Sequence, residues 1–442
     1  MTAILAQRTP HDLAGCGWYE ILPPPPPARE LDVDISADWI IAGAGFAGLA
    51  AARRLCQLRP GERIVVLEAQ RAGWGAAGRN SGFMIDLPHE LNSATYAGSA
   101  DADRQQIRQN RAALEFARAA VEEYGLRQVF SACGKYHGAV NPNGLGRLNA
   151  YCRHLDALNE PYSRLDASAM QRITGSEFYL GGIYTPGCVL IQPAAFIRGL
   201  AAALAEHHVE IYENSPVLRL ESGRMHTAYT ARGQVSAPRL ILTVNGHVES
   251  FGFYRKRLLH IFTYASMTRP LTLAERETLG GTTEWGLIPA DPMGTTLRRT
   301  HDHRILVRNT FTYNPGMTTS EGQIRRIGQV HDQSFHARFP MLDGVTMEYR
   351  WGGHLCLSRN VAPGFGEVRE RLYTAVCQNG LGTVKGTLSG MLVAELASGG
   401  NHPLLAEMLA APQPTALPPE PFTGIGVRTT LWWKQRRARR ER

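Results

Sequence analysis

Several features that would assign this protein to a simple class are missing from its sequence. No stretch of about 18 consecutive apolar residues occurs, so no transmembrane span is expected. The N-terminal segment MTAILAQRTPHDL has too short an apolar core for a secretory signal. The seven cysteines are odd in number and never form C-x-x-C, which argues against a disulfide framework or a structural zinc site. We therefore expect a cytoplasmic protein without a bound metal.

Lysine is also scarce, and the positive charge is concentrated at the C-terminus. The formal net charge is +8, and residues 428–442 contribute six of these charges, with seven basic residues and one acidic residue. The rest of the chain is near neutral, which argues against a nucleic-acid partner. A basic tail that contains Trp432 and Trp433 could contact an anionic membrane or RNA. The sequence favours instead a solvated terminal helix whose tryptophans pack against the body of the protein.

A glycine-rich turn near the N-terminus joins a predicted strand to a predicted helix. Residues 39–42 (WIIA) are apolar throughout, as in a parallel strand that is buried on both faces. The sequence then matches G-x-G-x-x-G at Gly43, Gly45 and Gly48, and a helical pattern continues to residue 58. The first glycine allows the tight turn, the second lets a pyrophosphate approach the backbone, and the third lets helix and strand pack closely. The helix N-terminus would offer unpaired N–H groups to phosphate.

An acidic residue completes this dinucleotide-binding pattern. Residues 64–67 (IVVL) form a second predicted strand, and Glu68 ends it twenty residues past Gly48. A carboxylate at this point can accept hydrogen bonds from both hydroxyls of an adenosine ribose. A second glycine-rich loop, residues 69–84 (AQRAGWGAAGRNSGFM), follows in place of the alternating strands and helices of an NAD dehydrogenase. Its small residues can wrap a long ligand and Arg79 can bind a phosphate, so the loop favours FAD over NAD.

The order and spacing of these motifs resemble a known family. The similar family is the FAD-dependent amine and amino-acid oxidases of the D-amino-acid oxidase (DAO) superfamily, with the gamma-glutamylputrescine oxidase-like branch as the closest. The resemblance covers most of the chain and is carried by residues 17–20, 37–55, 66–83, 240–250, 349–368 and 376–399. It implies an α/β fold, in which a Rossmann-like FAD-binding domain of the glutathione-reductase type carries an inserted antiparallel-sheet substrate domain.

The resemblance also implies that an early and a late glycine turn hold opposite portions of one FAD. Val217 stands where the family places a backbone contact to adenine, and Asn245 lies in a turn that returns to the cofactor. Residues 380–383 (GLGT) precede a helical pattern whose N-terminus would stabilise negative charge on the reduced flavin. The predicted cofactor-binding residues are Gly43, Gly45, Phe46, Ala47, Gly48, Glu68, Ala69, Gly75, Ala76, Ala77, Arg79, Asn80, Ser81, Val217, Asn245, Gly246, Gly380, Leu381, Gly382, Thr383 and Lys385.

Two departures from the family concern the surroundings and the attachment of the flavin. The family often has histidine where Leu381 stands. Relatives with covalent flavin use a histidine in the early glycine-rich loop or a cysteine in the late segment. Residues 69–84 contain no histidine, whereas Cys356 lies close to the position of that cysteine. Because a buried free cysteine is the commoner case, we expect non-covalent FAD.

The FAD-binding domain is expected to be discontinuous. Within the inserted domain, residues 258–271 and their neighbours alternate apolar and polar side chains, as in an antiparallel sheet. The predicted division is an N-terminal arm at 1–36, the FAD-binding domain at 37–90, 185–250 and 345–405, the substrate domain at 91–184 and 251–344, and a basic C-terminal extension at 406–442.

In the similar enzymes this sheet covers the reactive face of the flavin. The predicted catalytic residues are therefore His260 and Tyr264, with Lys385 from the late helix. Arg298 and His303 are the predicted substrate-binding residues. Each could instead be structural or exposed. Arginines 298, 299, 304 and 308 could recognise a carboxylate, or could be charges at the edge of a strand.

The sequence therefore predicts an FAD-dependent oxidase or dehydrogenase that acts on a small-molecule amine or amino acid. A hydride equivalent would pass from the substrate to flavin N5, the imine would hydrolyse, and oxygen or another acceptor would take the electrons. One alternative is a flavin monooxygenase, although the Gly-Asp pair typical of that class does not occur. Another is a non-catalytic flavin-binding or assembly protein. The sequence leaves the oligomeric state open.

Overall fold

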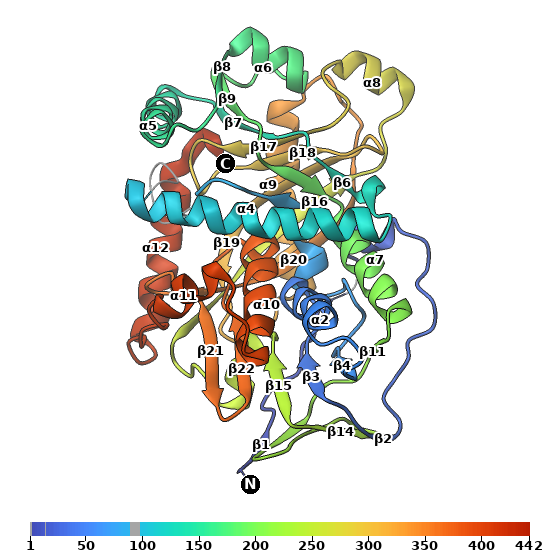
Figure 1. The fold of residues 1–442 in the computed structure, drawn as a ribbon. Helices are drawn as coiled ribbons and strands as arrows, with labels where there is room; N and C mark the ends of the chain where they lie inside the picture. Colours follow the sequence, from blue (N-terminus) through green and yellow to red (C-terminus); the bar gives the residue numbers. More distant parts are fainter. Residues whose placement is uncertain (1, 14, 89–97) are drawn as a thin grey trace.

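A six-stranded sheet forms the half of the molecule that contains the N-terminus (Figure 1). The computed structural model describes residues 2–13, 15–88 and 98–442. All neighbouring strands of this sheet are parallel except the pair β21–β22. The strand order is β11 (Val209–Tyr212), β4 (Ile64–Leu67), β3 (Trp39–Ala42), β15 (Arg239–Leu242), β22 (Leu372–Val376) and β21 (Gly364–Arg369).

Two helices pack closely against each other beside this sheet. They are α2 (Phe46–Leu58) and α10 (Gly382–Ser398), and both are largely buried. A Cβ atom at Gly390 would lie 2.1 Å from the carbonyl oxygen of Ala47, so only glycine permits this approach of the two backbones. Alternate residues of β3 and β4 share one buried core with the apolar residues of α2 and α10, and the residues between them face a second core on the other side of the sheet. This packing fixes the positions of both helix N-termini.

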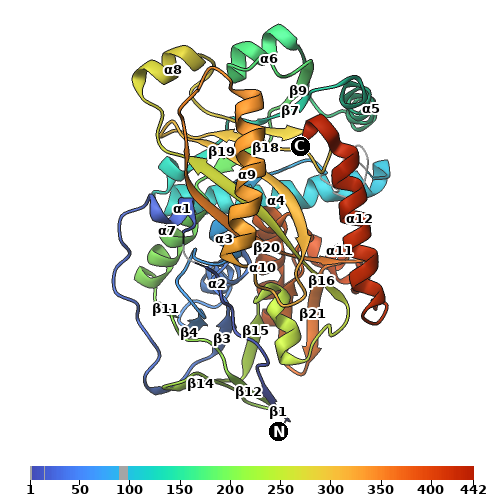
Figure 2. The same cartoon turned by 180° about the vertical axis from the view of Figure 1, so that it is seen from behind.

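An eight-stranded sheet forms the opposite half of the molecule. Its neighbouring strands are antiparallel except the parallel pair β17–β7, which joins the two predicted segments of the substrate domain. Helix α9 (Glu321–Arg338) lies over this sheet (Figure 2). The strand order is β20 (Met347–Ser358), β16 (Leu258–Thr268), β19 (Ile305–Tyr313), β18 (Thr296–Arg299), β17 (Trp285–Pro289), β7 (Lys135–Ala139), β9 (Gly181–Thr185) and β8 (Ser163–Asp166). The predicted α/β fold with an antiparallel-sheet insertion is confirmed.

Strand β20 lies in the predicted FAD-binding segment 345–405 but pairs with β16 of the second sheet. The register places Gly352 opposite Tyr264 and Cys356 opposite His260. This strand therefore carries residues of the late segment into the second sheet. The predicted boundary between residues 90 and 91 lies outside the described residues.

The N-terminal arm is attached to the body by two short strands. β1 (Thr2–Leu5) and β2 (Asp34–Ser36) flank a five-stranded sheet that also contains β12 (Arg219–Ser222), β13 (His226–Tyr229) and β14 (Gln234–Ala237). β5 (Phe83–Met84), β10 (Val189–Ile191) and β6 (Phe130–Ser131) form a three-stranded sheet. The other helices are α1 (Gly17–Glu20), α3 (Ala76–Arg79), α4 (Ala100–Glu123), α5 (Pro142–Leu158), α6 (Ala167–Thr174), α7 (Pro193–Glu206), α8 (Leu273–Leu279), α11 (Pro403–Ala410) and α12 (Phe422–Ala438). Within the described residues, no helix has the length and apolarity needed to cross a bilayer.

Candidate active site

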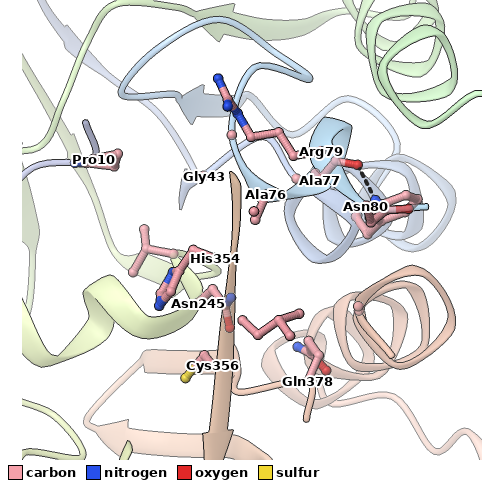
Figure 3. A pocket seen from close by; sticks show the side chains of 18 of the residues that line it. Pro10, Gly43, Ala76, Ala77, Arg79, Asn80, Asn245, His354, Cys356 and Gln378 are labelled. Carbon is pink, nitrogen blue, oxygen red and sulfur yellow. Dashed lines mark hydrogen bonds between the residues drawn. The ribbon is translucent and has the colours of Figure 1, made fainter. Parts of the chain in front are cut away.

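A cavity lies between the six-stranded and the eight-stranded sheet. One side of its lining comes from the ends of β3, β4 and β15, from α3 and from the N-termini of α2 and α10. The other side comes from β16, β18, β19 and β20, and residues 8–12 of the N-terminal arm also contribute. Figure 3 shows Arg79, Asn245, His354 and Gln378 arranged around this space. The cavity thus meets the carboxyl ends of parallel strands, where open α/β sheets bind ligands.

The two long helices α2 and α10, and the single turn α3, begin at this cavity without a side-chain cap. Their N-cap residues, Gly45, Leu381 and Gly75, all line the cavity. Unpaired N–H groups and the helix dipole at such ends attract negative charge. In contrast, seven other helices have N-terminal side-chain caps, which come from Ser99, Asn141, Asp166, Gln192, Thr272, Ser320 and His402. The cavity therefore offers anion-binding positions from two separate helices.

The first and third glycines of G-x-G-x-x-G have different structural roles. Gly43 has a φ of +102°, which side chains with a Cβ rarely adopt, and it lines the cavity. Gly48 lies inside α2, where a Cβ atom would stand 1.8 Å from the carbonyl oxygen of Gly43. Gly48 is therefore required for packing, and it is not among the cavity-lining residues.

Glu68 is fixed at the cavity by two backbone N–H groups. Its Oε2 atom accepts from the N–H of Ala44 at 2.8 Å, and its Oε1 atom accepts from the N–H of Gln70 at 3.0 Å. Burial raises the pKa of this carboxyl, and the two hydrogen bonds oppose that shift. Each carboxylate oxygen can accept more than one hydrogen bond. The residue thus retains capacity for the two ribose hydroxyls of an adenosine.

The second glycine-rich loop is held by tryptophans from distant segments. Trp18 donates from Nε1 to the carbonyl oxygen of Asn80 at 2.8 Å, and Trp351 donates to that of Arg79 at 2.9 Å. The guanidinium of Arg79 donates to the carbonyl oxygens of Trp74 and Leu13. Arg79 lines the cavity. Its guanidinium nevertheless binds these two carbonyl oxygens, and the bond to Leu13 ties the loop to the N-terminal arm.

Tyr264 and Arg308 line the cavity from the eight-stranded sheet. The hydroxyl of Tyr264 lies 2.7 Å from Oγ1 of Thr312 and 3.2 Å from Oγ1 of Thr319. Arg308 is half-buried, and its guanidinium carbon lies 5.2 Å from the ring centroid of Phe311. The register pairs Arg308 with Ala265 and Tyr264 with Asn309, so the two side chains lie on opposite faces of the sheet. The ring of Tyr264 packs with Ile324 and Ile327 of α9, whereas Arg308 brings a cation to the cavity.

Three histidines and one glutamate form a connected group beside the same cavity. His247 and His354 line it. His260 lies behind His354, with Nδ1 at 3.1 Å from Nε2 of His354 and Nε2 at 2.7 Å from Oε2 of Glu249. Burial is the first cause that lowers the pKa of His354 well below its usual range, and nearby His260 and His247 add to it. Burial likewise lowers the pKa of His247 to about 4. Both cavity-lining imidazoles are therefore neutral near pH 7.

All the predicted cofactor-binding residues line this one cavity except Gly48, Gly246 and Lys385. Among the predicted catalytic residues, Tyr264 lines the cavity, whereas His260 and Lys385 do not. The roles of all these residues stay predictions. The structure brings the early and late glycine turns to a common space, as the predicted FAD site requires.

The two predicted substrate residues lie away from the cavity lining. Arg298 is buried, donates to the carbonyl oxygen of Ile191, and pairs with Glu284 at 3.5 Å. His303 has a φ of +63° in the turn between β18 and β19. Of the four strand arginines 298, 299, 304 and 308, Arg308 lines the cavity.

Cys356 also lines the cavity, next to a second cysteine. The Sγ atom of Cys377 lies 3.8 Å from the carbonyl oxygen of Cys356, and both thiols are free and buried. A hydrogen bond with Cys377 and burial raise the pKa of Cys356 well above its usual range. Its thiol is therefore protonated and a weak nucleophile. Non-covalent attachment of FAD stays a prediction.

Several cavity residues were not predicted from the sequence. His354 was missed, although it stands two residues before Cys356 and must share its face of the strand. Residues 8–12 and Gln378 were also missed. Nothing in the sequence around residues 8–12 predicts that the arm reaches the cavity, because its path depends on tertiary contacts.

Comparison with known families and proteins gives a consistent result. Residues 38–396 match the family model described as FAD dependent oxidoreductase. The chain is 25% identical over 376 residues to gamma-glutamylputrescine oxidoreductase of Escherichia coli K12, which covers 84% of this chain and 86% of that protein. It is 23% identical over 407 residues to sarcosine oxidase subunit beta of Rhodobacter capsulatus, which covers 88% and 90%.

Solved structures share the fold at lower sequence identity. Glycine oxidase of Geobacillus kaustophilus superposes with a TM-score of 0.71 and 18% identity, and covers 87% of this chain and all of that one. Iminodiacetate oxidase of Chelativorans sp. BNC1 gives a TM-score of 0.67 and 17% identity, with 86% of this chain and all of that one covered. Apart from residues 8–12, the residues that line the cavity lie within the part of the chain that matches the family model.

Proposed function

Because the chain belongs to the FAD-dependent oxidoreductase family, we propose that it oxidises the C–N bond of an amine or amino acid that carries a carboxylate. When bound, FAD supplies the acceptor for the hydride equivalent that leaves the carbon next to nitrogen. The imine product then hydrolyses to a carbonyl compound and to ammonia or a smaller amine. The names of the similar gamma-glutamylputrescine oxidoreductase and glycine oxidase support a substrate of this kind.

The observation that carries this proposal is Arg308 of the eight-stranded sheet, which lines the same cavity as the uncapped N-terminus of α10. Arg308 binds the substrate carboxylate, since a guanidinium matches a carboxylate in charge and in hydrogen-bond geometry. The N-terminus of α10 provides the positive end of a helix dipole on the other side.

The glycine turns and Glu68 hold the cofactor in this proposal. The N-terminus of α2 receives the pyrophosphate, and Glu68 accepts hydrogen bonds from the adenosine ribose. The absence of side-chain caps at Gly45 and Leu381 supports the proposal, because those N–H groups are left for a ligand. Residues 380–383 then lie at the flavin end.

The histidine group removes a proton from the substrate. A substrate ammonium must become a neutral amine before hydride leaves the adjacent carbon. Burial lowers the pKa of His354, so this imidazole is a weak base and acts as a relay. The proton that it accepts is passed through His260 to the partly buried carboxylate of Glu249. The surrounding burial excludes water from the reacting atoms.

Anaerobic reduction of the holoenzyme tests this function. We would mix the FAD-loaded protein with amines and with amino acids or gamma-glutamyl amines, and follow the flavin absorbance at about 450 nm. The proposal predicts bleaching by at least one carboxylated amine, and slower or no bleaching by its decarboxylated analogue. If no amine reduces the flavin, the protein is a non-catalytic flavin-binding protein or acts on another substrate class. Admission of oxygen afterwards distinguishes an oxidase, which recovers its colour, from a dehydrogenase.

A further inference from the structure

Helix α12 has one buried and one exposed face, and both faces carry large apolar side chains. On the inner face, Val427, Leu431 and Ala438 pack in a cluster with Ile261 and Tyr313. The outer face presents large side chains that are 53–68% exposed, namely Phe422, Ile425, Trp432 and Trp433. The prediction that the two tryptophans pack against the body is therefore wrong, because Val427 and Leu431 occupy that position instead.

The exposed apolar residues lie on a single face of the helix. Phe422, Ile425, Thr429, Trp432 and Arg436 follow one another at steps of three or four residues, and Trp433 is four residues from Thr429, so the four apolar side chains share one stripe with Thr429 and Arg436. Each of them is exposed. Figure 2 shows α12 along the outer edge of the molecule, with its length accessible from one side. Large apolar side chains gathered on one exposed face normally mark an interaction surface, so the outer face calls for a partner.

This helix is firmly held, so it cannot turn its outer face inward. The side chain of Gln435 accepts from the N–H and donates to the carbonyl oxygen of Phe311, both at 3.0 Å. Beyond the helix, the carbonyl oxygen of Glu441 accepts from Thr295 at 2.7 Å and from Arg338 at 2.9 Å. The tryptophans are thus presented to solvent by an anchored element.

Positive charge accompanies the apolar stripe. Arg428, Arg436 and Arg437 are exposed, and none of them forms an ion pair with a carboxylate in the part of the chain that the structure describes. The guanidinium of Arg436 lies 5.1 Å from the ring centroid of Trp432, and that of Arg437 lies 5.3 Å from Trp433. Aromatic rings beside unpaired arginines are typical of helices that lie in the interface of an anionic membrane.

We propose that the outer face of α12 docks on an anionic lipid surface. Trp432, Trp433, Phe422 and Ile425 would enter the boundary between headgroups and acyl chains, while Arg428, Arg436 and Arg437 would contact lipid phosphates. Charge favours lipid over a second copy of this chain, because two such faces would repel each other. Only the outer face of α12 would contact the membrane. The residues that line the cavity would not touch it. This inference is independent of the proposed function.

Co-sedimentation of the holoenzyme with vesicles tests the proposal. We expect binding to vesicles of phosphatidylcholine with phosphatidylglycerol, roughly tenfold weaker binding to pure phosphatidylcholine, and release by high salt. The double variant W432A/W433A should lose roughly tenfold in binding, and R436Q/R437Q should lose the preference for anionic lipid. Leu273→Ala removes an exposed leucine from α8 and should bind as the native protein does.

Three outcomes would overturn the proposal. The first is no binding to anionic vesicles at low salt. The second is undiminished binding by both double variants. The third is that the native protein does not bind vesicles but forms a dimer in sedimentation velocity, or a complex with RNA, and that W432A/W433A does not form it. Flavin absorbance of each variant confirms that it is folded, and because turnover is not measured, failure here leaves the proposed oxidation untouched.

Discussion

The Nδ1 atom of His260 lies 3.1 Å from the Nε2 atom of His354. Because the Glu249 carboxylate accepts from Nε2 of His260, Nδ1 of a neutral His260 must accept from Nε2 of His354. A neutral His354 then has its basic lone pair on Nδ1. When Nδ1 gains a proton, the proton on Nε2 can move to His260 and a further proton can move to Glu249.

Glu249→Gln should therefore slow the removal of the substrate proton. The amide retains an acceptor for the N–H of Lys256, which now binds Oε1 at 2.9 Å, but it cannot take up a proton. We expect flavin reduction to be about tenfold to a hundredfold slower, with a changed pH profile and an unchanged flavin spectrum. Stopped-flow reduction across pH measures this effect. Glu367→Gln is the matched control, since Glu367 is exposed and also accepts from a backbone N–H, and equal rates in both variants would contradict the relay.

Arg308→Gln should weaken the binding of carboxylated substrates. Loss of a charged hydrogen-bonded partner costs about 1.5–3 kcal/mol, so KM should rise about tenfold to a hundredfold. For a substrate analogue without the carboxylate, KM should change little. Steady-state kinetics on the two substrates gives the comparison. The exposed Arg326→Gln serves as the control, and a KM increase of the same size for both substrates would exclude a carboxylate contact.

Gly48→Ala should disrupt the turn that precedes α2. Its Cβ atom would lie 1.8 Å from the carbonyl oxygen of Gly43, and a backbone atom cannot move aside as a flexible side chain can. We expect a loss of about 3 kcal/mol in unfolding free energy, together with a lower FAD content. Urea unfolding and the absorbance ratio of flavin to protein measure both quantities. Gly146→Ala is the control, because a Cβ atom there meets no atom within 4 Å and alanine favours the helix by about 1 kcal/mol.

Glu441 should make the stability of the protein depend on pH. Burial raises its pKa to about 7, against the opposing effects of Arg338 and Arg147, and Asp291 adds to the rise. Between the ordinary value near 4.5 and pH 7, the folded state holds a proton that the unfolded state has released. The unfolding free energy should therefore fall by up to about 3 kcal/mol as pH rises through this window.

Glu441→Gln should remove this pH dependence and be more stable than the native protein at pH 8. Urea unfolding at pH 5 and pH 8 measures the difference. The exposed Glu277→Gln should behave as the native protein does. A native protein whose unfolding free energy is the same at both pH values, or which is more stable at pH 8, would contradict the assignment.

The nucleotide-binding unit was predictable because its signals are local. The sequence predicted strands at 39–42 and 64–67 and a helix to residue 58, and β3, β4 and α2 have those bounds. An apolar run, glycines in a tight turn and a helical pattern all act within about thirty residues. The meeting of the early and late glycine turns at one cavity followed from the family resemblance.

The substrate side was less predictable because its positions depend on strand register. Which arginine reaches the cavity depends on how far along the paired strands it lies. The pairing of β18 with β19 places Arg298 opposite Leu306 and Arg308 opposite Thr296, and of these four residues Thr296 and Arg308 line the cavity. His354 reaches the cavity because β20 pairs with β16. The orientation of Trp432 and Trp433 was not predictable either, because α12 carries apolar residues on both faces and the sequence does not say which face is buried.

A structure of the holoenzyme with an unreactive carboxylic acid, a substrate analogue that lacks the amine, tests the central claim most directly. The account predicts that the flavin ring lies between the N-terminus of α10 and the eight-stranded sheet, and that the carboxylate of the analogue contacts Arg308. A flavin ring outside this cavity, or an analogue bound in it without contact to Arg308, would contradict the account.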